Sequence, residues 1–287
     1  MAPVPPPASS PLPSGMPDVR LIAVDLDGSL LDDAKRVHPS FWALLDALDA
    51  RGIALCPASG RQYATLRQEF GRDDLVYIAE NGAYVVHRGR EVSSDTLPWP
   101  VASGAMAAVR RYIAAGADAG IVLCGKRSAY VERTDEPFLA QVEPYYARLE
   151  VVEDLSTVRD DEVLKVAVYD FVSSARLVAG PLRDLGPDAG VVVSGEFWVD
   201  VLSPTADKGH ALRAVQRALG VTREQTMAFG DYHNDLGMLA AAGWSYAMAN
   251  AHPDVHAAAR YVAPANTENG VVRTVVETLR IPGVLGL

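Results

Sequence analysis

The fold of this chain is decided by residues 20–31, Arg20-Leu21-Ile22-Ala23-Val24-Asp25-Leu26-Asp27-Gly28-Ser29-Leu30-Leu31. A short, wholly apolar run leading into acids predicts a strand buried on both faces, as in a parallel sheet. Such sheets bind ligands at the carboxyl ends of their strands, where Asp25 and Asp27 would emerge. Asp and Gly are also common turn residues, so this stretch alone leaves open whether the two acids form a site or only a turn.

The composition is that of an ordinary globular protein. The 287 residues are 49% hydrophobic and 22% charged, enough for one large domain or two smaller ones. The net charge of −10 argues against nucleic acid as a partner, and no apolar stretch approaches the roughly 20 residues of a membrane span. Cys56 and Cys124 each lie in an apolar run. This favours buried thiols over a disulfide and implies a reducing compartment, the cytoplasm.

The first 17 residues differ from the rest of the chain. They consist mainly of Pro, Ser and Ala, with no charged side chain before Asp18. They lack the basic start and apolar centre of a secretory signal. We therefore expect residues 1–17 to be a disordered tail and the fold to begin near Asp18.

Strand-like and helix-like segments alternate through residues 18–87. Further apolar strands are predicted at 53–58 and 75–79, and residues 41–48 and 62–70 have the apolar spacing of helices. This β-α-β-α-β order predicts an α/β fold with a parallel, Rossmann-like sheet and right-handed crossovers.

Residues 88–196 have a different pattern. Short strands lie close together with helices between them, which is typical of an α+β unit on an antiparallel sheet. The first pattern returns in residues 197–287, with a helix at 208–219 and a strand at 226–229. We therefore predict a core formed by 18–87 and 197–287, with an α+β domain inserted at 88–196.

Polar residues follow several of these strands. They are Asp25 and Asp27, Ser59, Lys208, Asp231, Asn234 and Asp235. Each has a plainer interpretation alone: Ser59 suits a helix N-cap, Lys208 a solvated helix position, and the acids suit turns. What favours a site is the combination of carboxylates, a hydroxyl, an amide and one lysine.

This set of residues suits phosphoryl transfer. Converging carboxylates repel one another unless a hard divalent cation joins them, and oxygen ligands favour Mg²⁺. One aspartate would attack phosphorus and form an aspartyl-phosphate. Lys208 would offset the phosphate charge, while Ser59 Oγ, the Gly60 amide and Asn234 hold its oxygens. A second carboxylate must protonate the leaving alkoxide and later activate water, and Asp27 is well placed for that role.

Four motifs, in this order, resemble those of the haloacid dehalogenase superfamily. They are Asp25-Leu26-Asp27-Gly28-Ser29-Leu30-Leu31, Ala58-Ser59-Gly60-Arg61, Asp207-Lys208-Gly209 and Gly230-Asp231-Tyr232-His233-Asn234-Asp235. The large insert between the second and third motifs resembles that of Cof-type members with a C2B cap. Residues 80–83 and 247–251 are also similar to that group, and residues 124–130 and 194–200 are similar to cap segments of bacterial sugar phosphatases.

The resemblance implies a role for each matching residue. Asp25 would be the nucleophile, and Asp27 the general acid and base, which also supplies a backbone carbonyl to Mg²⁺. Asp231 would be the third protein ligand, and Asp235 would support the metal through water or hydrogen bonds. The residues that would hold the phosphoryl group or substrate are Ser59, Gly60, Arg61 and Lys208, assisted by Asn234.

Three residues, in the first and fourth motifs, depart from the family pattern. Ser29 replaces the commoner threonine but keeps the hydroxyl. Tyr232 and His233 stand where small residues are frequent, and His233 has either a structural role in that turn or a contact with substrate or metal.

The cap should select the substrate by closing over the site and excluding water. Candidates for reaching the leaving group are Lys126, Arg127, Glu196, Phe197 and Trp198. An exposed hairpin would leave Lys126 and Arg127 as surface charges only. If Phe197 and Trp198 lie on a strand, only one of them can face the site.

The expected function is therefore Mg²⁺-dependent hydrolysis of small phosphorylated metabolites, sugar phosphates first among them. A phosphomutase uses the same chemistry but needs an intermediate that survives water. A catalytically silent binding protein is a third possibility, against which the intact Asp25, Asp27, Lys208 and Asp231 argue. The sequence does not indicate an oligomeric state.

Overall fold

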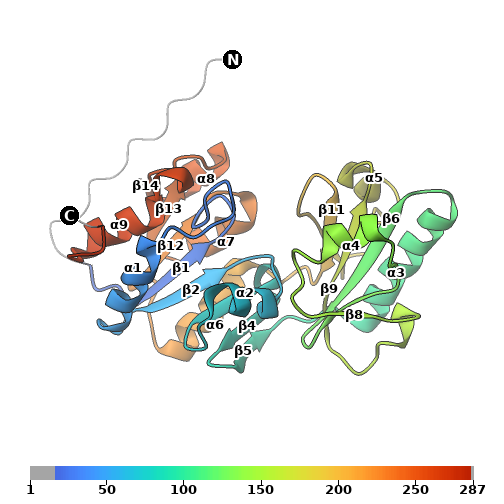
Figure 1. The fold of residues 1–287 in the computed structure, drawn as a ribbon, viewed down its shortest axis with the longest axis horizontal. Helices are drawn as coiled ribbons and strands as arrows, with labels where there is room; N and C mark the ends of the chain where they lie inside the picture. Colours follow the sequence, from blue (N-terminus) through green and yellow to red (C-terminus); the bar gives the residue numbers. More distant parts are fainter. Residues whose placement is uncertain (1–16, 286–287) are drawn as a thin grey trace, which may run out of the picture.

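The computed structural model describes residues 17–285, so the predicted tail, apart from Pro17, lies outside the described residues. The described chain forms two units that lie side by side, each built around its own sheet (Figure 1). We call them the core, which carries both ends of the described chain, and the cap. Within residues 17–285, no helix is both long and apolar enough to cross a membrane.

The core sheet has the strand order β14-β13-β12-β1-β2-β3-β4-β5. Its strands are β1 (Leu21–Asp25), β2 (Ala54–Ala58), β3 (Val76–Ala79), β4 (Tyr84–His87), β5 (Arg90–Ser94), β12 (Thr226–Gly230), β13 (Trp244–Met248) and β14 (Tyr261–Ala263). All pairs are parallel except those made by β4 and β5. Every residue of β1 is buried between β2 and β12. The predicted α/β, Rossmann-like sheet centred on this strand is confirmed.

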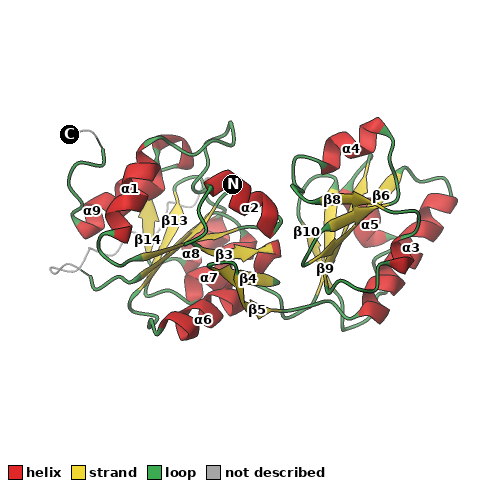
Figure 2. Ribbon diagram, turned by 60° about the horizontal axis from the view of Figure 1, so that its bottom comes forward, coloured by secondary structure: helices red, strands yellow, loops and turns green. Residues whose placement is uncertain are grey.

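Helices cover both faces of the core sheet (Figure 2). One layer holds α1 (Ser40–Asp49), α2 (Tyr63–Phe70) and α9 (Gly270–Leu279), and the other α6 (Lys208–Leu219), α7 (Leu236–Ala240) and α8 (Pro253–Ala258). Each layer has an apolar cluster of its own, with Phe41 and Leu44 in the first and Leu212 and Val215 in the second. Short 3₁₀ helices span Glu80–Gly82, Leu155–Thr157, His233–Asp235 and Asn266–Glu268.

The cap sheet has the order β10-β11-β9-β6-β7-β8. Its strands are β6 (Ala119–Gly125), β7 (Ala129–Val131), β8 (Leu149–Val151), β9 (Val163–Asp170), β10 (Gly190–Val193) and β11 (Trp198–Leu202). They pair antiparallel except for β7 with β8. Helices α3 (Trp99–Ala114) and α5 (Ser174–Ala179) pack on one face, and α4 (Glu136–Val142) on the other. The predicted α+β insert is confirmed, and Cys56 and Cys124 are buried free thiols.

The strand pairings place both boundaries of the insert at positions that differ from the predicted ones. The turn at Arg88 and Gly89, both with positive φ, folds β5 back onto β4, so residues 90–94 belong to the core sheet rather than to the cap. At the other boundary β11 pairs with β9 and β10, so residues 198–202 belong to the cap. The prediction erred because a strand pattern does not specify which sheet the strand joins.

A buried ion cluster connects the cap with the core. Lys165 on β9 is only 4% exposed, and its Nζ lies 2.8 Å from Glu80 Oε2 in the core and 3.2 Å from Asp200 Oδ2 in the cap. The same Nζ donates to the Gly60 carbonyl at 3.1 Å. Close by, the Gln62 side chain exchanges two hydrogen bonds with the backbone of Arg148. The cap therefore rests on the loop that follows β2.

Lys165→Met should lower the free energy of unfolding by about 3–5 kcal/mol, since Glu80 and Asp200 would remain buried without their cation. Urea denaturation followed by circular dichroism would measure this change. Arg36→Met is the control because it removes a surface pair, Arg36 with Asp32, and should cost less than about 1 kcal/mol. Equal losses in the two variants would show that the buried cluster contributes no more than a surface ion pair.

Candidate active site

The predicted site residues meet at the carboxyl ends of the central strands. Asp25 ends β1 and is aligned with Ala58 of β2, so Ser59 emerges beside it. On the other side Val24 is aligned with Phe229 of β12, which brings Gly230 and Asp231 to the same edge. The site therefore lies where parallel α/β sheets bind ligands.

Lys208 reaches this edge from the first turn of α6. Its side chain is buried, and Nζ donates to Asp25 Oδ1 at 2.5 Å and to Asp235 Oδ1 at 2.7 Å. Burial disfavours the charged form of Lys208 and lowers its pKa. The negative charges of Asp235 and Asp25 have the larger effect, so the pKa of the ammonium group is raised overall. The Asp207 carboxylate caps the helix by accepting the N–H groups of Gly209 and His210. Lys208 is thus a buried, paired cation and not a solvated helix residue.

Three carboxylates form a compact cluster around this lysine. One oxygen each from Asp25, Asp231 and Asp235 lies within 4.8 Å of the other two. Burial and the Asp235 charge raise the pKa of Asp25 well above its ordinary value and that of Asp231 to about 6. Carboxylates this crowded fit a hard divalent cation such as Mg²⁺, which would relieve their repulsion.

Asp235 has a supporting place in the cluster. Its Oδ1 accepts from Lys208, and its Oδ2 accepts the backbone N–H groups of Asp231 at 3.0 Å and Tyr232 at 3.2 Å. With both oxygens taken by protein donors, Asp235 positions the lysine and the Asp231 loop. Asp25 and Asp231 are the better candidates for direct metal contact.

Gly28 allows the first motif to approach Asp231 closely. Its φ is +81°, and a Cβ at this position would overlap the Asp231 carboxylate. The neighbouring Ser29 Oγ donates to Asp231 Oδ1 at 3.4 Å, so the hydroxyl retained at this position has a partner in the site. The Asn250 side chain, which was not predicted as part of the site, fixes the turn by donating to the Gly28 carbonyl at 2.8 Å.

Asp27 stands apart from the three-carboxylate cluster. Its side chain is 43% exposed and lies 3.0 Å from Arg61 and 2.7 Å from Lys35. Burial raises the pKa of Asp27, but the positive charges of Arg61 and Lys35 lower it further, so the pKa stays below its ordinary value. Arg61, predicted to hold phosphate, binds Asp27 and Glu69 here, and Lys35 was missed because it lies in a loop outside every motif.

Ser59 and Asn234, which were predicted to hold phosphate, contact other residues at this edge of the sheet. Ser59 is buried and its Oγ accepts the Arg61 N–H at 3.2 Å, whereas the N-cap of α2 is Gln62, so the N-cap interpretation of Ser59 is wrong. Asn234 is exposed and donates to Asn81 Oδ1 at 3.3 Å. Sequence reasoning gave Asn81 no role, although it follows another strand end, that of β3.

Four of the five cap candidates have side-chain partners away from the carboxylate cluster. Lys126 bridges Glu91 of the core at 2.9 Å and Glu162 of the cap at 2.8 Å, so it is not a free hairpin charge. Arg127 pairs with Asp160 at the surface, Glu196 is exposed, and both Phe197 and Trp198 pack against Tyr169. No hydrogen bond or ion pair within residues 17–285 joins these five side chains to Asp25, Lys208 or Asp231.

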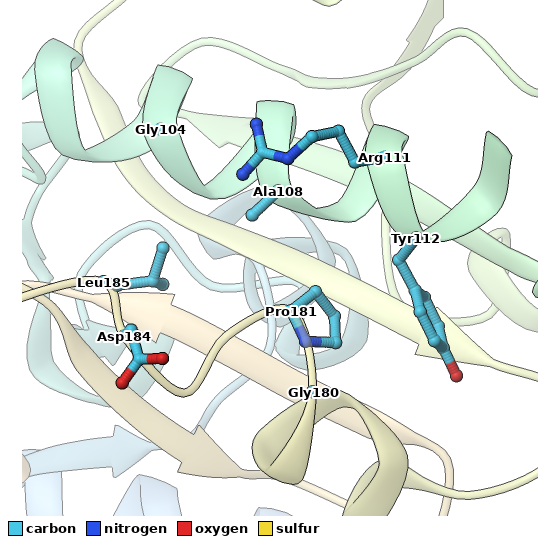
Figure 3. Close-up of a pocket in the computed structure, with 8 residues that line it drawn as sticks. All are labelled: Gly104, Ala108, Arg111, Tyr112, Gly180, Pro181, Asp184 and Leu185. Carbon is cyan, nitrogen blue, oxygen red and sulfur yellow. The ribbon is translucent and has the colours of Figure 1, made fainter. Parts of the chain in front are cut away.

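The cap has an open hollow of about 650 Å³ between α3 and the segment that follows α5 (Figure 3). Its lining residues are Gly104, Ala108, Arg111, Tyr112, Gly180, Pro181, Asp184 and Leu185. None of them is a predicted site residue. The hollow is therefore distinct from the carboxylate cluster.

The sequence profile of the haloacid dehalogenase-like hydrolases matches residues 22–275. The chain belongs to this family. It is 33% identical over 267 residues to the 5-amino-6-(5-phospho-D-ribitylamino)uracil phosphatase YbjI of Escherichia coli, covering 91% of this chain and 97% of the relative. It is 29% identical over 240 residues to the HMP-PP phosphatase of Cronobacter sakazakii, covering 82% and 86%.

The solved structures agree with this membership. The crystal structure of SMU.1108c from Streptococcus mutans aligns with a TM-score of 0.77 and 28% identity, covering 91% of this chain and 99% of that one. The curated relatives above are phosphatases. The predictions of a haloacid dehalogenase-type, Cof-type fold and of a phosphatase are confirmed.

Gly28→Ala should abolish phosphatase activity, because the new methyl group displaces Asp231. Gly52→Ala is a matched control, since Gly52 also has a positive φ but has no atom within 4 Å of a Cβ. Both variants should lose about 1–2 kcal/mol through backbone strain. Thermal unfolding would measure the loss of stability, and p-nitrophenyl phosphate hydrolysis would measure the loss of activity. Similar activities of the two variants would contradict the steric argument.

Proposed function

We propose that this protein is a Mg²⁺-dependent phosphatase of small phosphorylated metabolites, sugar phosphates in particular, and that it acts through an aspartyl-phosphate on Asp25. The observation that carries the proposal is the buried contact of Asp25 with Lys208 inside the three-carboxylate cluster. The name of the Escherichia coli relative describes a substrate with a phosphorylated ribityl chain, which supports a sugar or sugar-alcohol phosphate.

The chemistry divides between two aspartates. In the first step an oxygen of Asp25 bonds to phosphorus as the ester P–O bond breaks, and Asp27 gives a proton to the departing alkoxide. In the second step Asp27 takes a proton from a water molecule that attacks phosphorus, which releases phosphate and restores the Asp25 carboxylate. Asp25, Asp231 and the Asp27 carbonyl would hold Mg²⁺, which would supply positive charge in addition to that of Lys208.

The environments of the two aspartates support this division. Asp25 is 6% exposed and bonded to an ammonium group, so its oxygens have a fixed direction. Asp27 is more exposed, and Arg61 and Lys35 keep it ionised before substrate binds. A substrate phosphate would compete with Asp27 for Arg61. The pKa of Asp27 would then rise, which favours the protonated form needed for the first step.

Asp25→Asn should lower kcat for p-nitrophenyl phosphate by about 10⁴-fold or more, because the amide is not a nucleophile. Circular dichroism should show an intact fold, since Lys208 keeps Asp235 as its partner. Asp32→Asn is the control, because Asp32 pairs only with Arg36 outside the cluster and its loss should leave the rate unchanged. EDTA should abolish wild-type turnover, and excess Mg²⁺ should restore it.

The intermediate can be tested directly with ³²P-labelled p-nitrophenyl phosphate, whose leaving group departs without a proton from Asp27. After acid quenching, the Asp27→Asn variant should retain label on the protein. The double variant, with Asp25→Asn in addition, should retain none. Label that survives on the double variant would show that Asp25 is not the nucleophile. Isomerised sugar phosphate formed faster than free phosphate would instead identify a mutase.

Lys35→Ala should shift the pH profile for an alkyl phosphate. The first step needs protonated Asp27, so kcat/KM falls as pH rises through the pKa of Asp27. Removing Lys35 raises that pKa and moves the falling limb to higher pH. The shift should be at most about 0.7 unit, since an exposed ion pair is worth about 1 kcal/mol or less.

Two controls accompany this profile. An aryl phosphate, whose leaving group departs without a proton, should show no shift. Arg36→Ala removes a nearby exposed cation that pairs with Asp32 and should also leave the limb in place. A shift to lower pH, or equal shifts with both substrates, would contradict the role given to Asp27.

A further inference from the structure

A second cluster of metal-ligating side chains lies beside the carboxylate cluster. His233 comes from the loop after β12, and His252 and Asp254 come from the start of α8. One ligand atom from each lies within 4.8 Å of the other two. We propose that this triad binds a divalent transition-metal ion, Zn²⁺ in particular, at a site separate from the Mg²⁺ centre.

The spacing of the ligand atoms fits tetrahedral coordination. His233 Nε2 lies 2.9 Å from Asp254 Oδ2, and His252 Nδ1 lies 3.5 Å from the same oxygen. Two ligands that each lie about 2.0–2.1 Å from Zn²⁺ at a tetrahedral angle are about 3.3 Å apart. The two measured separations bracket this value, so a small movement of the imidazoles would complete the site.

The types of ligand select a different ion from that of the carboxylate cluster. Imidazole nitrogens suit zinc, copper and nickel, whereas Mg²⁺ prefers oxygen donors. Two histidines and one carboxylate leave a fourth position for water, and the side chains are 37–67% exposed, so water can reach it.

The present hydrogen bonds keep a ligand lone pair available. Nδ1 of His252 accepts the backbone N–H of Asp254 at 3.2 Å, so this nitrogen carries a lone pair rather than a proton. An ion bound there would replace that hydrogen bond, and it would also displace to solvent the proton that His233 Nε2 donates to Asp254. The ring of His233 lies 4.2 Å from the ring of His252, which already brings the two imidazoles to one place.

The triad is joined to the loop of the fourth motif. The backbone N–H of His252 donates to the Asp231 carbonyl at 2.9 Å, and His233 precedes Asn234 and Asp235 directly. An ion held by the triad would tie the start of α8 to the loop that carries Asp231. This would give His233, which departs from the family pattern, a ligand role outside phosphoryl transfer.

The experiment is a Zn²⁺ titration of the full chain in excess Mg²⁺, followed by calorimetry and by the ¹⁵N resonances of its six histidine rings. Wild type should bind one equivalent with two imidazoles shifting to metal-bound values. His233→Ala and Asp254→Asn should each weaken this binding by about 100-fold or more. His210→Ala is the matched control, since it removes a histidine paired with a single carboxylate, Asp207, and should leave the binding unchanged.

Two results would overturn the proposal. In one, Zn²⁺ binds without shifting any imidazole resonance, which would place it in the carboxylate cluster. In the other, His233→Ala binds Zn²⁺ as tightly as wild type, which would leave the triad as a surface ion pair only. Neither readout depends on catalysis, so the outcome is independent of the proposed phosphatase reaction.

Discussion

The arrangement of the active-site carboxylates depends on the ammonium group of Lys208. Two unit charges 4 Å apart interact by about 4 kcal/mol at the effective dielectric typical of proteins. Three carboxylates give three repulsive pairs, whereas Lys208 contacts only Asp25 and Asp235 and so gives two close attractive ones. The lysine therefore stabilises the cluster in part and leaves an excess of negative charge. That excess makes the site suited to a divalent cation, which would also offset the charge of a substrate phosphate.

Close backbone approach is the second requirement of the site. Gly28 lets the first motif touch Asp231, and Gly82, with φ +103°, lets the turn after β3 pack against the backbone of Asp207 just before Lys208. In both places a side chain would collide with the segment that carries a charged group. Gly28 thus determines how near the fourth motif can come to the first, and Gly82 determines how near the third motif can come to the turn after β3.

The sequence predicted the elements whose pattern is local. The apolar run of β1, the helical spacing of α6 and the strand ends bearing Asp25, Ser59 and Asp231 all follow from short-range rules, and the structure has them at the predicted places. The domain bounds placed residues 90–94 in the insert and residues 198–202 in the core, whereas the strand pairings have the reverse. Strand pairing depends on contacts between distant segments, which a local pattern does not specify.

The same limit applies within the site. Arg61 and Lys35 form ion pairs with Asp27, and Asn234 donates a hydrogen bond to Asn81. These contacts depend on how loops from different strand ends are arranged in the fold. Residue type and spacing do not encode such contacts. Asp235 illustrates the difference, because its place in a motif was evident, while its hydrogen bonds to Lys208 and two backbone amides needed the fold.

The position of the cap is coupled to the loop after β2 through buried polar contacts. Lys165 donates to the carbonyl of Gly60, whose amide is proposed to hold phosphate, and it also neutralises Glu80 next to Asn81. If the cap leaves the loop, Lys165 and Asp200 move away together and Lys165 separates from Glu80 and from the Gly60 carbonyl. A small opening that parts Glu80 from Lys165 while both stay buried would cost about 3–5 kcal/mol, because each charge would lack a partner and water. A movement that keeps the cluster intact and pivots around it avoids this cost, and it would leave the loop after β2 fixed while the rest of the cap moves.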